Sequence, residues 1–279
     1  MSLASITASF RRTFAILLTG LLVSTGCTVN NVDVDDSLGQ PFEEAGAKGT
    51  FGMFDNSRGR FTIYNLDRFK ERFSPASTFK IVNAMIGLQT GRLTTDSTVI
   101  PWDVVQRERP EWNQDLSLYR AFRYSSVPHF QTLARSIGRD TMQRWLDTLK
   151  YGNMRIGSAV DSFWLDTTLQ ISPDEQLGLV KRLYFRQLPF RASVQESVKK
   201  MMIQENNALY QLAYKTGMGR TREGRPMAWM VGWIEENRHV YPFVLNLDVK
   251  PQDVDRLSDI RVKILKDILA RLGFFQGKM

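Results

Sequence analysis

The sequence predicts an α+β fold. It has a central antiparallel sheet formed by both ends of the chain and flanked by terminal helices, with a mostly helical lobe inserted in the middle. Strand-like segments occur at 50–65 and again after residue 209, whereas residues 71–206 are predicted to be mostly helical. With 279 residues and 43% hydrophobic content, the chain can bury a sizeable core. We expect a functional site in the cleft between two such lobes.

The first 26 residues are predicted to be a signal peptide. Arg11 and Arg12 precede an apolar run at 14–23, which is too short for a permanent membrane span. Cys27 follows Ser24-Thr25-Gly26, which resembles a bacterial lipoprotein cleavage site, where the cysteine would be lipidated and anchor the chain to a membrane. The alternatives are ordinary signal-peptidase cleavage, with Cys27 incidental, and a twin-arginine signal. All of them predict export, to the periplasm.

Residues 27–279 are predicted to form a single domain. Its α/β lobe would comprise about 45–70 and 207–279, and its helical lobe about 71–206. Residues 28–38 are polar and acidic, a composition that predicts a tether without regular structure.

Local signals predict the elements before residue 209. A short helix is expected at 41–47, followed by strands at 50–54 and 60–65 that are joined by a four-residue turn ending in glycine. Within the helical lobe, Ser172-Pro173-Asp174-Glu175 and Ser193-Val194-Gln195-Glu196 both match the capping box that starts a helix.

The C-terminal part predicts a second hairpin and a final helix. Strands at 227–234 and 240–249 flank the turn at 235–239, and an amphipathic helix at 257–272 is stopped by Gly273. The apolar face of that helix carries Leu257, Ile260, Ile264, Leu265, Ile268, Leu269 and Leu272.

Composition argues against several classes of function. The formal net charge is +8, but lysine and arginine are spread along the chain without an aromatic-interleaved basic stripe, so we predict a solvated surface and no nucleic-acid partner. Cys27 is the only cysteine, which rules out an intramolecular disulfide. His129 and His239 lack neighbouring ligands, so no metal site is predicted. No pattern in the sequence fixes the oligomeric state.

The tetrad Ser77-Thr78-Phe79-Lys80 is the strongest chemical signal. It opens an apolar stretch that is predicted to be a buried helix ending at Gly91, and Lys80 shares a helix face with Ser77. An amine beside a serine hydroxyl is the minimum arrangement for an activated nucleophile. A second Ser-x-x-Lys match begins at Ser197 and is predicted to lie on a solvated helix face.

Four further motifs follow Ser77 in order. They are Ser125-x-Val127, Tyr151-Gly152-Asn153, Phe163-Trp164-Leu165 and Lys215-Thr216-Gly217. Each of the two glycine-containing triplets is expected by chance in only a few per cent of chains of this length. Their order after Ser-x-x-Lys makes coincidence remote.

Together these motifs resemble those of the class D serine β-lactamases, the oxacillinases, over residues from about 45 to 272. Ser-x-x-Lys and Lys-Thr-Gly also occur in class A β-lactamases and penicillin-binding proteins, but the Ser-Asp-Asn of class A is here Ser125-Ser126-Val127. Tyr-Gly-Asn and the Trp-Leu pair are the class D set. The resemblance implies the β-lactamase and penicillin-binding transpeptidase fold, and hydrolysis of penicillin- or oxacillin-type β-lactams through an acyl-enzyme on Ser77.

The resemblance also implies the chemistry around Ser77. Its N–H and that of Met218 would form the oxyanion hole. Lys80 would be buried with a lowered pKa and would add CO2, supplied as bicarbonate, to become an N-carboxylysine that serves as general base. No other cofactor is implied. Trp164 would donate its indole N–H to the buried carbamate, and Ser125 would relay a proton to the leaving lactam nitrogen.

The other site residues are expected to bind or enclose the β-lactam. Lys215 would supply positive potential, Thr216 and Arg261 would bind the substrate carboxylate, and Gly217 would let the strand approach the ligand closely. Three further assignments are architectural or apolar: Tyr151-Gly152-Asn153 as a structural motif, Val127 and Leu165 as the pair that admits water, and Trp112 as a pocket wall.

Two alternatives stay open at this point. The first is a β-lactam sensor or binding protein that acylates on Ser77 without efficient turnover. The second is a small penicillin-binding protein with DD-peptidase activity, although such proteins usually carry Ser-x-Asn where this chain has Ser125-x-Val127. Hydrolysis of carbapenems or cephalosporins would depend on the loop at 218–226, and the sequence does not indicate its shape.

Overall fold

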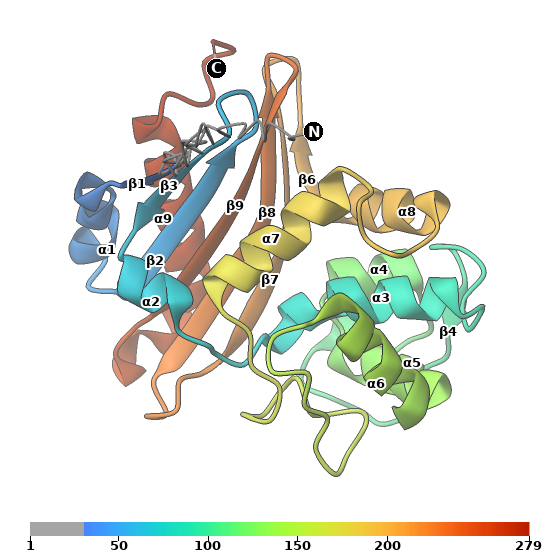
Figure 1. Cartoon of the computed structure of the whole chain (residues 1–279). Coiled ribbons are helices and arrows are strands. Elements are labelled where there is room, and N and C mark those ends of the chain that lie inside the picture. The colour runs from blue at the N-terminus through green and yellow to red at the C-terminus, as the bar shows by residue number, and fades with distance from the viewer. Residues whose placement is uncertain (1–30, 279) are drawn as a thin grey trace, which may run out of the picture. The chain divides into compact units, whose positions relative to one another are not determined.

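The computed structural model describes residues 31–278, so the predicted signal peptide and Cys27 lie outside the described residues. The fold is built around a seven-stranded sheet with the strand order β1-β3-β2-β9-β8-β7-β6 (Figure 1). The strands are β1 (Val32–Val34), β2 (Lys48–Asp55), β3 (Arg60–Tyr64), β6 (Ile203–Asn206), β7 (Tyr210–Arg220), β8 (Pro226–Glu236) and β9 (His239–Asp248).

The sheet joins the two ends of the described chain, as predicted, because β2 pairs directly with β9. The predicted hairpins are confirmed as β2–β3 and β8–β9. Every pair of neighbouring strands is antiparallel except β1 and β3, which run parallel. This single parallel pair arises from a segment that was not predicted to be a strand.

The prediction of a tether at 28–38 is wrong for the described residues from 31 onward. Val32 pairs with Phe61 in β1, and a 3₁₀ helix, η1 (Asp36–Gly39), buries Leu38. One of the acidic side chains that suggested a solvated segment has a partner within the sheet: Asp33 forms an ion pair with Arg60 on the neighbouring strand. Composition alone does not reveal a partner 27 residues away.

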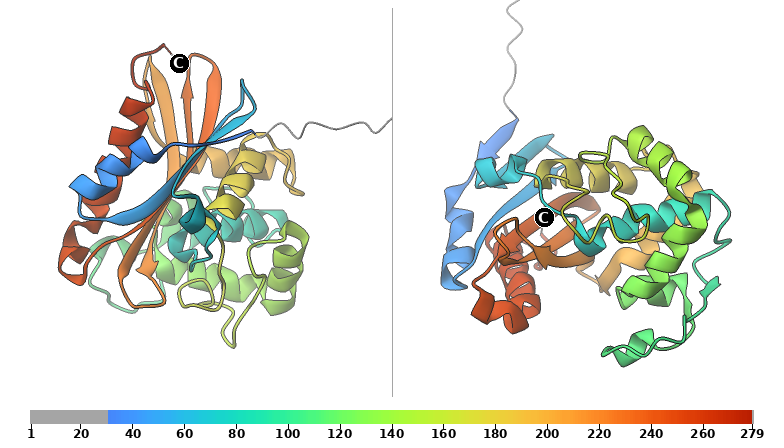
Figure 2. Two further views of the ribbon diagram at one scale, coloured as in Figure 1. Left: turned by 60° about the vertical axis from the view of Figure 1, so that its left-hand side comes forward. Right: turned by 90° about the horizontal axis from the view of Figure 1, so that it is seen from below.

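Helices cover both faces of the sheet (Figures 1 and 2). On one face, α1 (Gln40–Glu44) and α9 (Leu257–Arg271) pack against residues such as Phe51 and Phe243. The predicted apolar face of α9 is buried from Leu257 to Leu269, and Gly273 ends the helix with a φ of +95°. This packing holds α9 against β8, so that a residue on the helix can reach the neighbouring strand β7.

The other face carries α2 (Leu66–Lys70), which was not predicted, and the helical layer that the sequence predicted. That layer comprises α3 (Lys80–Gln89), α4 (Leu118–Arg123), α5 (Val127–Ile137), α6 (Arg139–Leu149), α7 (Pro173–Tyr184) and α8 (Ala192–Met202). The layer is not helical throughout. A two-stranded sheet of β4 (Val99–Ile100) and β5 (Leu116–Ser117) lies within it, and β6 occupies residues that were predicted to be helical.

One of the two predicted capping boxes is present. The Ser172 side chain accepts from the Glu175 N–H, and the Glu175 side chain accepts from the Ser172 N–H. The second prediction is wrong, because α8 begins at Ala192 with Arg191 at the N-cap. Arg191 bonds to the carbonyl of Leu88 and the side chain of Gln89 at the end of α3, which fixes the start of α8 before Ser193 is reached.

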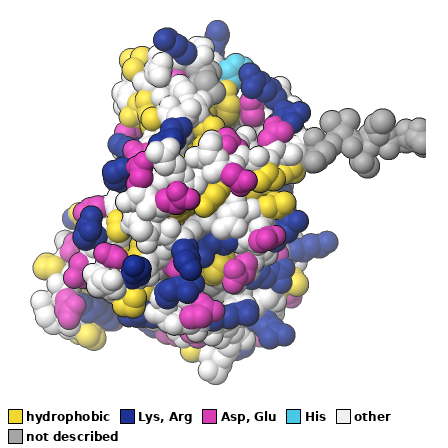
Figure 3. Space-filling view, turned by 90° about the vertical axis from the view of Figure 1, so that its left-hand side faces the viewer, with side chains coloured by type: hydrophobic (Ala, Val, Ile, Leu, Met, Phe, Trp, Pro, Cys, Tyr) yellow, Lys and Arg dark blue, Asp and Glu magenta, His cyan; other side chains and the backbone are white. Residues whose placement is uncertain are grey.

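Charges of both signs are mixed on the surface. On the side of the molecule shown in Figure 3, lysine and arginine side chains are interspersed with aspartate and glutamate. Within residues 31–278, no helix combines the length and the apolar character needed to cross a lipid bilayer.

Candidate active site

Ser77 lies in a tight turn that leads directly into α3. The turn is a 3₁₀ helix, η2 (Ala76–Phe79), and Ala76 has a φ of +48°, a left-handed conformation that is strained for a residue with a side chain. Strand β7 passes close to this turn. A Cβ atom on Gly217 would lie 3.1 Å from the Pro75 carbonyl oxygen, so glycine is what allows the approach. As a result the backbone beyond Gly217 faces the Ser77 turn.

Lys80 donates a hydrogen bond from Nζ to the Ser77 hydroxyl over 2.7 Å. The lysine has no exposed surface, and burial, followed by the nearby charge of Arg109, lowers its pKa to about 7. A substantial fraction of Lys80 is therefore a neutral amine near pH 7. A neutral amine in contact with a hydroxyl can accept its proton, which is what an activated serine requires.

Ser125 and Lys215 form a second serine–lysine contact beside the first. Lys215 donates from Nζ to the Ser125 hydroxyl over 3.0 Å, and Ser125 has a φ of +51° in the turn between α4 and α5. Burial holds the pKa of Lys215 well below its usual value, and the positive charges of Lys80, Arg261 and Arg123 lower it further. The pair can therefore pass a proton across the site.

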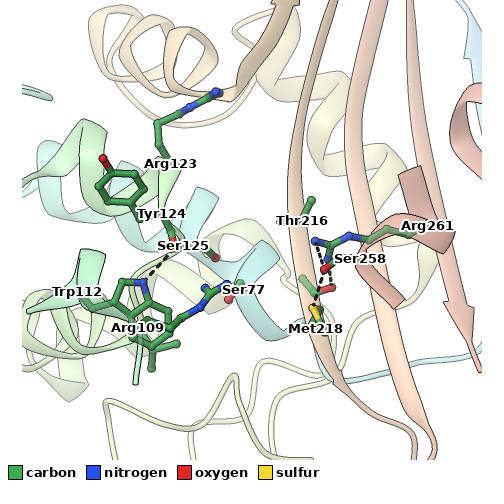
Figure 4. Close-up of a pocket in the computed structure, with 12 residues that line it drawn as sticks. Ser77, Arg109, Trp112, Arg123, Tyr124, Ser125, Thr216, Met218, Ser258 and Arg261 are labelled. Carbon is green, nitrogen blue, oxygen red and sulfur yellow. Dashed lines mark hydrogen bonds between the residues drawn. The ribbon is translucent and has the colours of Figure 1, made fainter. Parts of the chain in front are cut away.

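A cavity of about 380 Å³ opens above Ser77 (Figure 4). It is lined by Ser77, Arg109, Trp112, Arg123, Tyr124, Ser125, Val127, Thr216, Gly217, Met218, Ser258 and Arg261. Eight of the residues that the sequence predicted for the site therefore line one cavity: Ser77, Trp112, Ser125, Val127, Thr216, Gly217, Met218 and Arg261. Lys80 and Lys215 are buried and reach the site through the two serine hydroxyls.

Arg261 is held on the wall formed by β7 and α9. Its Nη1 donates to the Gly217 carbonyl over 3.2 Å and its Nη2 donates to the Ser258 hydroxyl over 3.3 Å, while its buried Nε has no partner. Burial lowers its pKa to about 10. Within residues 31–278, none of the ion pairs includes Arg261. An unneutralised guanidinium at a pocket wall is suited to binding a carboxylate.

Trp164 is fully buried and stacks on Phe79 with ring centroids 5.4 Å apart. Its indole Nε1 has no hydrogen-bond partner, and a buried N–H without an acceptor is uncommon in proteins. Leu165 was predicted to admit water together with Val127, and that role stays a prediction. Its N–H closes a turn onto the Ser162 carbonyl, its side chain is 36% exposed, and it is not among the residues that line the cavity.

The Tyr151-Gly152-Asn153 motif ties the segment that carries Trp164 to the core. Asn153 donates from Nδ2 to the Thr168 carbonyl, accepts from the Gln170 N–H and donates its own N–H to the Gln170 carbonyl. Tyr151 packs edge-on against Phe79, the ring that Trp164 stacks on. These contacts are what an architectural role requires, because they fix where the buried indole lies.

We predict that Gly152→Ala destabilises the protein. Gly152 has a φ of +53°, and a Cβ there would collide with the Gln170 carbonyl oxygen. The left-handed conformation alone costs a non-glycine residue about 1–2 kcal/mol, so with the collision we expect Tm to fall by about 5 °C or more. Gly178→Ala in α7 is the matched control, because nothing lies within 4 Å of its Cβ position. Thermal unfolding with equal Tm values for both variants would contradict the prediction.

Comparisons with known proteins agree with this geometry. Residues 43–270 match the family model for the penicillin-binding protein transpeptidase domain. The chain is 40% identical over 238 residues to the probable β-lactamase YbxI of Bacillus subtilis, which covers 85% of each chain. It also resembles the crystal structure of a class D β-lactamase from Nostoc, with 36% identity, a TM-score of 0.80, and coverage of 86% of this chain and 99% of that one.

The chain belongs to the class D β-lactamase family. The same fold also includes a receptor. The C-terminal domain of the BlaR penicillin receptor of Bacillus licheniformis is 31% identical, has a TM-score of 0.82, and is matched over 88% of this chain and 98% of that domain. Membership of the class D family therefore fixes the fold, and the roles of the individual site residues are left to be argued from their geometry.

Four residues that line the class D pocket were missed by the sequence analysis: Arg109, Arg123, Tyr124 and Ser258. Arg109 belongs to a charged run, Arg107-Glu108-Arg109, which has the composition of a solvated loop. Ser258 could have been found, because it lies three residues before Arg261 and so shares its helix face.

Proposed function

We propose that this chain hydrolyses β-lactams of the penicillin and oxacillin type through an acyl-enzyme on Ser77. The observation that carries the proposal is the 2.7 Å contact between Ser77 and the fully buried Lys80, in a class D fold. In acylation, Ser77 Oγ attacks the lactam carbonyl as Lys80 takes its proton. The C–N bond of the lactam then breaks, and Ser125, backed by Lys215, protonates the departing nitrogen.

The negative charge that develops on the lactam carbonyl oxygen needs donors. We propose the backbone N–H groups of Ser77 and Met218, since Gly217 brings β7 against the Ser77 turn. The carboxylate of the substrate would bind Arg261 and Thr216 on the same wall. Before deacylation, the proton that Lys80 took from Ser77 replaces the one that Ser125 gave to the lactam nitrogen, so Lys80 is again free to accept. Water then attacks the Ser77 ester and gives a proton to Lys80. Lys80 returns this proton to Ser77 Oγ as the ester C–O bond breaks, which releases the ring-opened acid and restores the serine.

We propose further that Lys80 carries CO2 as an N-carboxylysine, whose carboxylate supplies the general base for both steps. Two features of the site fit this group. Lys80 has a pKa of about 7 and is neutral often enough to react with CO2, and the buried Trp164 Nε1 lacks an acceptor. Trp164 would donate to the carboxylate, and the rings around Lys80 would exclude water that could release the CO2.

The alternative is a β-lactam sensor that acylates on Ser77 without efficient turnover. The similarity to the BlaR penicillin-receptor domain favours it. Acid-quenched mass spectrometry after mixing with ampicillin separates the two. A hydrolase shows a Ser77 adduct that decays as intact protein is recovered, whereas a sensor keeps one adduct per chain for hours.

We also propose that the protein is exported to the periplasm, with residues 1–26 removed as a signal peptide and Cys27 lipidated as an anchor to the membrane. The proposal rests on the sequence pattern around Cys27. Mass spectrometry of the mature protein from membranes is expected to find an N-terminal Cys27 with the added mass of a lipid. An unmodified N-terminus in the soluble fraction would remove the anchor from the proposal.

A further inference from the structure

The cavity above Ser77 has positive charge on two opposite walls. Arg261 lies on the wall of β7 and α9, whereas Arg109 lies on the segment between β4 and β5 that also carries Trp112 (Figure 4). Figure 4 shows the Arg109 side chain extending toward Ser77 from the side opposite Arg261. The role proposed above for Arg261, binding the substrate carboxylate, leaves the guanidinium of Arg109 without a function.

Arg109 is held in place but is not neutralised. Its guanidinium lies 5.0 Å from the centre of the Trp112 ring, which fixes its direction. Within residues 31–278, its only ion pair joins Nε to Glu111 Oε1 over 3.7 Å, and the two side chains are 56% and 37% exposed. A pair this long and this exposed contributes little. No aspartate or glutamate is among the described residues that line the cavity.

The charge of Arg109 acts inside the site. Burial is the largest cause of the lowered pKa of Lys80, and the charge of Arg109 is the second. The same charge also lowers the pKa of Arg261. Arg109 lines the same cavity as Ser77 and extends toward it from the wall opposite Arg261, so it is placed to bind part of a ligand attached to Ser77.

The shape of a penicillin determines which part of the bound molecule lies near Arg109. The ring carboxylate lies on the side of the lactam nitrogen, and the acylamido arm leaves from the carbon beside the lactam carbonyl, in the opposite direction. With the ring carboxylate on Arg261 and Thr216, the acylamido arm extends toward the wall of Arg109. We propose that Arg109 determines specificity by binding a second carboxylate on the acylamido arm, so that this enzyme favours dianionic penicillins. This inference rests on the proposed β-lactam hydrolysis.

Carbenicillin and benzylpenicillin test the proposal, because they differ by one carboxylate on that arm. We expect Arg109→Gln to lower the kcat/KM ratio of carbenicillin to benzylpenicillin about tenfold, mainly through KM, as loss of a hydrogen bond to a charged group implies. Arg109→Lys keeps the charge and should retain most of the ratio. Arg58→Gln is the charge-matched control, since Arg58 is 78% exposed in the β2–β3 turn.

A second measurement uses the unmodified enzyme and does not depend on how a variant folds. Raising the salt concentration should raise KM for carbenicillin more than for benzylpenicillin, because exposed charge pairs are screened. The role of Arg109 would be overturned if Arg109→Gln left the kcat/KM ratio of carbenicillin to benzylpenicillin unchanged, including the case in which kcat/KM fell equally for both penicillins. Failure of the wild-type chain to turn over benzylpenicillin would instead defeat the proposed function on which the inference rests.

Discussion

Ser77→Ala is expected to abolish turnover, with a loss of at least about 10⁴-fold in kcat, because removal of a catalytic serine leaves only binding and the oxyanion hole. The fold should tolerate the change. The hydroxyl accepts one hydrogen bond, from Lys80, and the turn that holds it is fixed by other contacts, including the Thr78 hydroxyl donating to the Pro75 carbonyl. Initial rates of ampicillin hydrolysis measure the loss of turnover, and Tm shows whether the fold is retained.

The chain contains its own control for this experiment. Ser197 begins the second Ser-x-x-Lys match and lies on α8, with its partner Lys200 exposed to solvent. Ser197→Ala should therefore keep wild-type turnover. If Ser77→Ala retained more than about a tenth of the wild-type rate, a serine acyl-enzyme would be the wrong mechanism, whatever the family of the chain.

Trp164→Phe is expected to slow deacylation about 100-fold or more while slowing acylation much less. Phenylalanine preserves an aromatic ring on Phe79 but removes the indole N–H, so the carboxylate proposed on Lys80 loses its buried donor. A positioned general base contributes about 10²–10⁴-fold, and deacylation depends on it because water is a weak nucleophile. Pre-steady-state kinetics with nitrocefin resolve the two steps.

The same variant should change the response to pH and bicarbonate. The Lys80 pKa of about 7 means that the amine gains a proton as the pH falls below 7, and a protonated amine cannot hold CO2. Wild-type activity should therefore fall in degassed acidic buffer and recover with bicarbonate. Trp164→Phe should need more bicarbonate at every pH.

Trp233→Phe is the matched control for loss of a buried indole, because the Trp233 Nε1 bonds to Glu235 on β8 and has no link to Lys80. It should lower stability without changing the bicarbonate requirement. Equal slowing of acylation and deacylation in Trp164→Phe, or indifference of the wild type to bicarbonate, would remove Trp164 and the carboxylated lysine from the mechanism.

The contacts that the sequence predicted best are local ones. Ser77 and Lys80 meet because residues three apart share a helix face, and the glycine of Lys215-Thr216-Gly217 marks a close backbone approach. The β2–β3 and β8–β9 hairpins are local in the same sense. The order of the motifs along the chain resembles that of the class D enzymes, and this resemblance is what predicted that the motifs lie together in one site.

The errors arise where a distant partner changes the meaning of a local pattern. Asp33 suggested a solvated tether, but Arg60 binds it within the sheet. Ser193 fitted a capping box, but the contact of Arg191 with α3 starts the helix earlier.

Arg109 shows why some site residues cannot be found by pattern. In the sequence it is one of several charges in a loop, and nothing distinguishes it from Arg107, whose guanidinium binds Asp103 on the same loop. Only the path of the segment between β4 and β5 brings Arg109 to the wall opposite Arg261. Part of the positive charge in this pocket therefore comes from a loop, and a local sequence pattern does not identify it.

The central claim, that the chain is a hydrolase and not a sensor, is tested most directly by counting products. Purified protein is incubated with excess ampicillin in bicarbonate buffer, and the ring-opened acid is measured against the concentration of active chains. We predict many product molecules for each chain at a constant rate. Release that stops at one equivalent, with ampicillin still bound to Ser77, would contradict the account and assign the chain to β-lactam sensing.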